Sequence, residues 1–160
     1  MKKKIVIVVN EFQNIINFRL SLINYLSQKN LDISIICYSK KNIQKLNFKK
    51  NSDIPIYFLS GKSKGKSLIG ELIGIYGLFK LIRSINPELI LSFTVKTNLY
   101  SSLISKFLEI NIINTITGLG STYIDGGSMN KFIFIMYKFS LGKKTSYIFQ
   151  NKDDRNVFKK

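Results

Sequence analysis

Short apolar runs alternate with longer amphipathic segments along the whole chain. The apolar runs are continuous and rich in Ile and Val, a pattern that is typical of strands buried on both faces of a parallel sheet. Six such strands are predicted, at residues 4–9, 32–38, 54–59, 88–93, 110–116 and 146–150. Elsewhere apolar residues recur three and four positions apart, which predicts helices at residues 15–28, 67–84, 98–108, 129–141 and 153–160.

This alternation of strands and helices predicts the fold. Successive β-α-β units form a parallel sheet, and right-handed crossovers place helices on both of its faces. We therefore expect one α/β domain over residues 1–160, with a Rossmann-like, doubly wound parallel sheet in three layers. Ligands of such domains bind beyond the carboxyl ends of the strands, so the site is expected there.

Composition narrows the class of protein. A chain of 160 residues with 45% hydrophobic residues is long and apolar enough to build a core, which excludes a disordered chain. The formal net charge of +16 is typical of partners such as nucleic acid or an anionic membrane. The cations are almost all lysine, however, and the only arginines are Arg19, Arg83 and Arg155. Nucleic-acid readers favour arginine, so we expect no nucleic-acid partner; part of the charge reflects the Lys-, Asn- and Ile-rich composition of an AT-rich genome.

The residue types also limit the chemistry. The chain has no histidine and a single cysteine, Cys37, which excludes imidazole-based catalytic triads and makes a zinc site implausible. Cys37 lies in an apolar run and is expected to be a small buried side chain, in keeping with a reducing cytosol. The apolar run at residues 5–9 is too short for a signal peptide. The most hydrophobic segment, residues 68–82, carries Glu71 and Lys80 and is too short to span a membrane.

The stretch "LSGKSKGKSLIG" (59–70) resembles a phosphate-binding loop at a strand–helix junction. Gly61 and Gly65 are one residue too close for the G-x-x-x-x-G-K-[ST] spacing, and the strand at 88–93 ends in Ser-Phe instead of a magnesium-binding Asp. We interpret the stretch as a basic surface loop, and a divergent kinase that uses Lys66 is the alternative. A dinucleotide site is also disfavoured, because no glycine directly follows the first strand.

Polar residues gather after the predicted strands. They are Asn10, Glu11, Asn14, Asn17 and Arg19 after the first strand, Thr94, Lys96, Thr97 and Asn98 after the fourth, Thr115 and the glycine-rich "TGLGSTYIDGG" after the fifth, and Gln150 and Asn151 after the sixth. The four glycines of the fifth loop permit tight backbone and close approach of a ligand such as a phosphate. Asp125 in that loop is either a catalytic carboxylate or a helix cap.

Three stretches resemble a known family. "NFRL" after the first strand, "FTVKTNLYSSLISKFLEINIINTITGLGSTYI" and "YIFQNKDDRNVF" look like the N-terminal domain of bacterial family 4 glycosyltransferases. The most similar type acts on undecaprenyl-diphosphate-linked sugars in the synthesis of capsule, O-antigen or N-glycan precursors. The resemblance spans nearly the whole chain, and "INTITGLGSTY" followed by "IFQNKDDR" is its most specific part.

This resemblance implies a glycosyltransferase of the GT-B fold, in which two Rossmann-like lobes enclose the active site. The N-terminal lobe receives the lipid-linked acceptor, and the C-terminal lobe binds the nucleotide-sugar donor. The implied reaction is retaining and needs no metal or cofactor, because the donor's own phosphate takes the acceptor proton. Such chemistry depends on positioning and electrostatic stabilisation, so it is possible without histidine.

The resemblance also implies site residues. Arg19, Lys96, Asn98 and the loop at 117–120 match the family by position, and relatives often carry His at Asn17 and near Val95, a difference that bears on acceptor specificity. No residue is assigned a catalytic role. The predicted substrate-binding residues are Asn10, Asn17, Arg19, Lys96, Thr97, Asn98, Thr117, Gly118, Gly120 and Asn151.

Two further expectations concern the rest of the protein. The family's donor-binding domain would begin near Lys160, so we expect the chain to be a truncated product, a fragment or one partner of a split enzyme. A lipid acceptor implies peripheral binding at the inner face of the plasma membrane, and Lys62, Lys64, Lys66 and the helix "MNKFIFIMYKF" are the predicted contacts. The helix is equally compatible with sheet packing and interdomain contact, and the alternative function is a basic nucleotide- or nucleic-acid-binding module.

Overall fold

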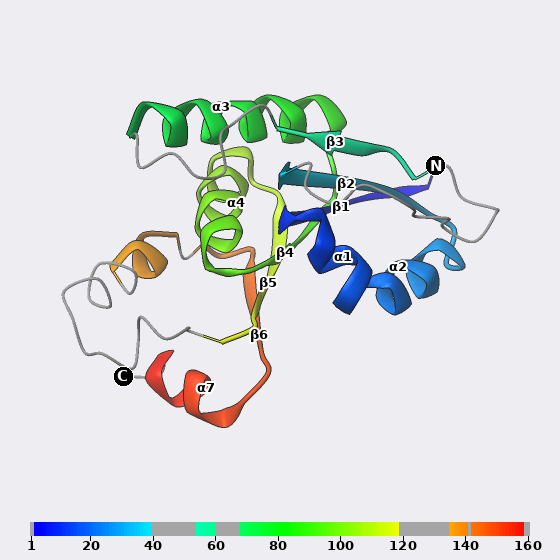
Figure 1. Ribbon diagram of the computed structural model, residues 1–160. Coiled ribbons are helices and arrows are strands. Elements are labelled where there is room, and N and C mark those ends of the chain that lie inside the picture. The colour runs from blue at the N-terminus through cyan, green and yellow to red at the C-terminus, as the bar shows by residue number, and fades with distance from the viewer. Residues whose placement is uncertain (1, 40–53, 60–67, 119–134, 141, 159–160) are drawn as a thin grey trace.

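The computed structural model describes residues 2–39, 54–59, 68–118, 135–140 and 142–158. Its centre is a six-stranded sheet in the order β3-β2-β1-β4-β5-β6, and every neighbouring pair is parallel (Figure 1). The strands are β1 (Lys3–Glu11), β2 (Leu31–Ser39), β3 (Ile56–Phe58), β4 (Leu89–Phe93), β5 (Asn111–Ile116) and β6 (Thr145–Phe149). This topology confirms the predicted Rossmann-like, doubly wound sheet.

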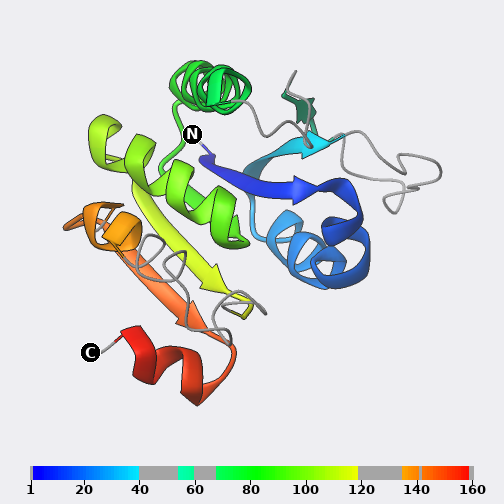
Figure 2. The same ribbon diagram turned by 60° about the vertical axis from the view of Figure 1, so that its left-hand side comes forward.

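Helices cover both faces of the sheet. They are α1 (Phe12–Phe18), α2 (Leu20–Ser27), α3 (Leu68–Ile85), α4 (Val95–Leu108) and α7 (Lys152–Phe158), and residues 135–140 are also helical. Figures 1 and 2 show α1 and α2 on one side of the sheet and α3 and α4 on the other. Because the strand order reverses between β1 and β4, the carboxyl ends of these two strands form the topological switch point, where ligands of this fold bind.

Two boundaries differ from the sequence prediction in ways that affect the site. The helix predicted at residues 15–28 is divided at Arg19 into α1 and α2. The helix predicted to begin at residue 98 begins at Val95, so that Lys96 and Thr97, which were expected in a loop, lie in the first turn of α4. The other described elements lie within a few residues of their predicted ranges.

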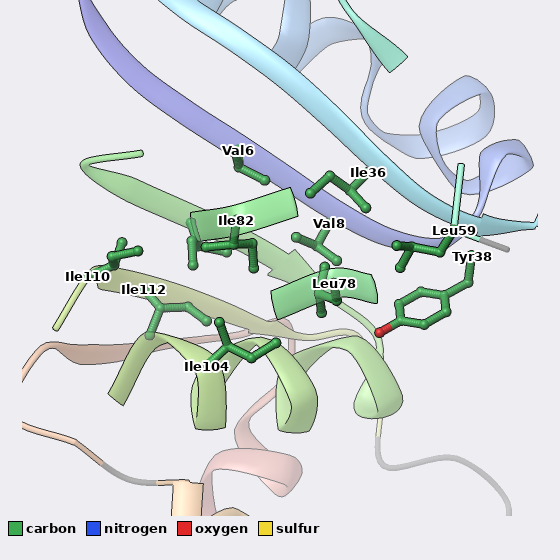
Figure 3. Packing of buried hydrophobic residues seen from close by; sticks show 11 residues of the cluster. Val6, Val8, Ile36, Tyr38, Leu59, Leu78, Ile82, Ile104, Ile110 and Ile112 are labelled. Atoms are coloured by element: carbon green, nitrogen blue, oxygen red, sulfur yellow. The ribbon is translucent and has the colours of Figure 1, made fainter. Parts of the chain in front are cut away.

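The larger core lies between the sheet and α3 and α4. Val6, Val8 and Ile36 point from β1 and β2 toward Leu78 and Ile82 of α3, and all five side chains are fully buried (Figure 3). Leu78 and Ile82 are one helical turn apart and lie on the same side of α3 as Gly74. A Cβ at Gly74 would lie 3.3 Å from the Tyr38 ring, so the glycine lets the helix approach the sheet closely.

A second core lies on the opposite face, under α1 and α2. Ile7 and Val9 of β1 pack with Phe12, Ile15 and Ile23 of the two helices. Cys37 belongs to this cluster, and burial raises the pKa of its thiol to about 12, which confirms the prediction of a small buried side chain. Among the described helices, none is long and apolar enough to cross a membrane.

Candidate functional site at the switch point

A pocket of about 250 Å³ lies at the carboxyl edge of the sheet, on the face that α1 and α2 cover. Its lining comes from four segments of the chain that the fold brings together: the end of α1, the end of β4, the segment after β5 and the segment after β6. The lining residues are Asn14, Phe18, Arg19, Phe93, Thr94, Thr117 and Gln150. This volume lies slightly below the roughly 300–1,000 Å³ that is usual for ligand sites.

Arg19 supplies the charge of the pocket. It lies in the break between α1 and α2, where its backbone leaves the helical conformation (φ −126°, ψ −3°). The guanidinium carbon lies 4.2 Å from the centre of the Phe93 ring, and Nη1 donates to the carbonyl oxygen of Phe18 at 3.4 Å. Burial lowers the pKa of Arg19 below its ordinary value, but a guanidinium remains protonated in proteins. The break in the helix therefore holds a half-buried cation against an aromatic face.

Thr94 carries backbone strain at the same pocket. It stands between β4 and α4 with φ 86° and ψ 151°, a conformation that is nearly restricted to glycine. Its carbonyl oxygen accepts from the amide nitrogen of Asn98 at 2.9 Å, and its hydroxyl lies 3.1 Å from that of Thr97. Strained residues of this kind concentrate at functional sites, where the surrounding structure holds them in place.

Lys96 lies on the other face of the sheet edge and is already paired. Its Nζ is 2.7 Å from Oε1 of Glu71 in the first turn of α3, and each side chain is about one third exposed. The Tyr100 hydroxyl donates to Oε2 of the same carboxylate at 2.9 Å, and the Lys96 ammonium lies 5.5 Å from the centre of the Tyr38 ring. Burial alone would raise the pKa of Glu71, but the hydrogen bonds from Lys96 and Tyr100 and the lysine charge outweigh it and lower that pKa.

Thr97 and Asn98 do not reach the surface. Both side chains are fully buried, because α4 begins at Val95 and turns them toward the protein interior. The Thr97 hydroxyl donates to the carbonyl oxygens of Phe93 and Thr94, and Asn98 Nδ2 donates to the carbonyl oxygen of Thr115 at 3.1 Å. In this structure both side chains bind backbone carbonyl oxygens and hold the ends of β4 and β5 together.

The other three predicted asparagines are not among the described residues that line the pocket. The Oδ1 atom of Asn10 is buried at the end of β1, and among the described residues it meets no hydrogen-bond donor. Asn17 is exposed and accepts a hydrogen bond from Nε2 of Gln13 at 2.9 Å. Asn151 caps α7, since its Oδ1 accepts from the amide nitrogen of Asp154 at 2.7 Å.

Of the predicted glycine loop, the described part ends at Gly118, which has φ 125° beside the pocket residue Thr117. Gly120, Asp125 and the lysines Lys62, Lys64 and Lys66 lie outside the described residues. Within the described ranges, no group of three or more His, Cys, Asp or Glu side chains is arranged to hold a metal ion.

In the described part of the lining, the pocket brings one cation together with neutral hydrogen-bonding groups. Arg19 and Thr117 were both predicted from the sequence as site residues, and Asn14, Thr94 and Gln150 belong to the polar residues expected at the strand ends. Phe18 and Phe93 are not among the predicted site residues, and because the cation–π partner of Arg19 is Phe93, far from it in the sequence, no local pattern indicates that contact. Among the lining residues that the structure describes, there is no carboxylate. It therefore suits a ligand that carries an anionic group and several hydroxyls.

Several solved structures share the fold of this chain. Sucrose-phosphate synthase from Thermosynechococcus elongatus aligns with a TM-score of 0.70 and 11% identity over 99% of this chain and 45% of its own length. A UDP-N-acetylglucosamine 2-epimerase aligns with a TM-score of 0.68 and 15% identity over 99% and 44%. MurG of Acinetobacter baumannii aligns with a TM-score of 0.53 and 13% identity over 78% and 39%. At these identities the similarity shows a shared fold, and the chain spans less than half the length of each of these proteins.

Sequence comparison identifies the family. No curated protein sequence matches the chain significantly. The family described as "Glycosyl transferase 4-like" matches residues 4–151, a range that begins in β1 and includes every residue that lines the pocket. The chain therefore belongs to the glycosyl transferase 4-like family.

Proposed function

We propose that this chain is the acceptor-binding lobe of a glycosyltransferase that transfers a sugar from a nucleotide-sugar to a lipid-linked saccharide. The observation that carries the proposal is the pocket at the switch point of a family 4-like chain, with the Arg19 guanidinium held among uncharged polar groups. A lipid-linked acceptor offers a diphosphate for the guanidinium and sugar hydroxyls for Asn14, Thr117 and Gln150.

The donor-binding half of this enzyme is proposed to be a second Rossmann-like domain, supplied by a further segment or by a partner chain. The reaction is proposed to retain the anomeric configuration, with the donor phosphate taking the proton of the acceptor hydroxyl. The described chain would then contribute binding and orientation, which can account for a large part of a transferase's rate enhancement. Its product would enter the synthesis of a cell-surface polysaccharide or glycan.

Acceptor binding by the whole chain tests the proposal. Titration with a short-chain polyprenyl-diphosphate-linked sugar, followed by calorimetry, is expected to show binding that Arg19→Ala weakens by roughly 2 kcal/mol, about thirtyfold. Arg19→Lys keeps the charge without the planar fork and is expected to lie between the two. Arg155→Ala, which removes an exposed arginine of α7, is the matched control and should bind as the unaltered chain does.

Two outcomes would contradict the proposal. Equal affinity of the unaltered chain and of Arg19→Ala for the polyprenyl-diphosphate-linked sugar would mean that the pocket does not bind the acceptor. Tight binding of a nucleotide-sugar by this chain alone would contradict the proposed division between the lobes. For UDP-N-acetylglucosamine in particular, it would favour a role like that of the structurally similar epimerases.

A further inference from the structure

Phe18 is an exposed aromatic side chain in the lining of the pocket at the switch point. It is 66% exposed, whereas Phe93, the other aromatic residue of the described lining, is 5% exposed and already lies against the Arg19 guanidinium. Exposed apolar side chains are common on protein surfaces. Among the described residues, however, Phe18 is the one large apolar side chain that is both exposed and part of this pocket. Its ring is therefore available to a ligand.

Core packing does not account for Phe18. Ile15, about one turn earlier on α1, is fully buried and belongs to the core under α1 and α2. Phe18 is the last residue of α1 and belongs to none of the hydrophobic clusters of the described residues. The apolar side of α1 thus leaves the core at the end of the helix, where the pocket begins. Packing within the described part of the chain does not require a large aromatic residue at this position.

Hydrogen-bonding groups surround the Phe18 ring. Asn14 is four residues earlier, so its amide lies on the same side of α1 as the ring. Arg19 Nη1 donates to the carbonyl oxygen of Phe18 at 3.4 Å, which holds the guanidinium next to the end of the helix. Thr117 and Gln150 add a hydroxyl and an amide from the segments after β5 and β6. An aromatic ring, a cation and neutral donors and acceptors therefore meet in one pocket.

A sugar ring has the chemistry that matches this lining. Its hydroxyls need hydrogen-bond donors and acceptors, while its C–H groups form an apolar face. The face of an aromatic ring is the negative part of its quadrupole and attracts such C–H groups. A polyprenyl chain, by contrast, is apolar throughout and would leave the amides and hydroxyls of the lining without partners, which costs free energy. The lining therefore favours a saccharide over the lipid chain as the part of the ligand beside Phe18.

We infer that Phe18 stacks on the acceptor sugar that is attached directly to the diphosphate, and that it helps to select this sugar. The stacking rests on the proposed function, in which Arg19 binds the diphosphate. Because Phe18 and Arg19 are adjacent in the chain and line the same pocket, a diphosphate at the guanidinium brings the first sugar, and not a more distant one, next to the ring. A sugar with an axial hydroxyl on the stacked face binds less well, because the hydroxyl displaces C–H contacts.

Calorimetry with two probes tests the stacking. Geranyl-diphosphate-linked N-acetylglucosamine and the methyl ester of geranyl diphosphate carry the same lipid and the same charge, and they differ in the sugar. The unaltered chain is expected to bind the sugar-linked probe about tenfold more tightly. Phe18→Leu keeps an apolar side chain without an aromatic face and is expected to weaken binding of that probe alone by about fivefold, whereas Phe18→Tyr keeps the affinity. Tyr25→Leu on α2 removes a 57% exposed aromatic residue that is not in the described lining, and it is the matched control.

Fluorescence reports on the contact directly. The chain has no tryptophan, so Phe18→Trp provides a single indole at the pocket. Its emission is expected to shift to shorter wavelength when the sugar-linked probe is added, and to shift less with the methyl ester. Tyr25→Trp, on the neighbouring helix, should respond to neither probe.

Three results would overturn the stacking while Arg19→Ala still weakens binding of both probes, so that the proposed function stands. They are equal affinity of the unaltered chain for the two probes, a Phe18→Leu variant that weakens both probes equally or neither, and equal emission shifts at positions 18 and 25. Equal weakening of both probes by Phe18→Leu would mean that the ring contacts the lipid chain. If the affinity for neither probe depends on Arg19, the proposed function is contradicted, and the stacking with it.

Discussion

Thr94 combines two features that rarely occur together, a β-branched side chain and a positive φ. Its φ of 86° and ψ of 151° fall in a region used almost only by glycine, and such a residue costs of order 1–3 kcal/mol. The conformation persists because β4 and α4 are each fixed by packing on either side of it. The strain therefore shapes the edge of the pocket at the expense of stability.

Thr94→Gly is accordingly expected to stabilise the fold. Glycine removes most of the strain, although it also loses the contact with Thr97 and gains freedom in the unfolded chain, and the expected net gain in the free energy of unfolding is about 1 kcal/mol. Thr94→Ala keeps the Cβ and hence the strain, so it should be no more stable than the unaltered chain. Urea unfolding followed by circular dichroism distinguishes the two variants. A glycine variant that is less stable than the alanine variant would show that the strain is not there.

At the scale of elements, the apolar runs predicted every strand of the sheet. Burial on both faces explains the continuous apolar runs of the central strands, whereas the edge strands β3 and β6 are only partly buried. The break at Arg19 was not predictable, since "NFRLSLINYL" keeps a helical spacing across it. The start of α4 at Val95 was not predicted, because Thr94 and Val95 are β-branched and such residues favour strands over helices. The pairing of Lys96 with Glu71 joins residues 25 positions apart, and no local pattern reports such a contact.

Asn151 is a predicted binding residue whose hydrogen bonds are explained by its position at the start of α7. Its Oδ1 accepts from the amide nitrogen of Asp154, and its Nδ2 donates to the Asp154 carboxylate, each at 2.7 Å. This is the geometry of a helix N-cap, and α7 begins at the next residue. The capping role is sufficient to explain an asparagine there, whereas substrate contact requires a further test.

Asn151→Ala is expected to lower the free energy of unfolding by about 1 kcal/mol, the usual cost of a lost cap. Asn151→Ser should retain most of that stability because serine also caps helices, and Asn156→Ala on the same helix serves as a control for composition. Thermal unfolding measures these differences. If Asn151 only caps the helix, the affinity for the acceptor analogue stays unchanged in Asn151→Ala. A large loss of affinity would instead mean that Asn151 contacts the acceptor.

At the scale of the whole molecule, the chain has 25 basic and nine acidic residues. A carboxylate as well placed as Glu71 can bind Lys96, but there are too few acids to pair with most of the lysines. The folded state therefore gathers positive charge that the unfolded chain keeps further apart, and this repulsion opposes folding.

Added salt is therefore expected to stabilise this protein. Raising potassium chloride from about 10 mM to about 200 mM shortens the screening length from roughly 30 Å to below 10 Å, which weakens repulsion between lysines across the surface. A gain of about 1 kcal/mol is expected, which raises the melting temperature by about 2–4 °C for a chain of this size. Chloride is preferred over sulfate in this measurement, because sulfate stabilises folded proteins by exclusion from their surface.

A charge variant separates screening from other effects of the salt. Lys2→Glu with Lys3→Glu changes two exposed residues near the N-terminus, and each replacement lowers the formal net charge of +16 by two units. If repulsion is the cause, this variant is more stable than the unaltered chain at low salt, and the salt-dependent rise in its melting temperature is smaller. A melting temperature that falls with salt in the unaltered chain would instead mean that attractive pairs such as Lys96–Glu71 outweigh the repulsion among the lysines.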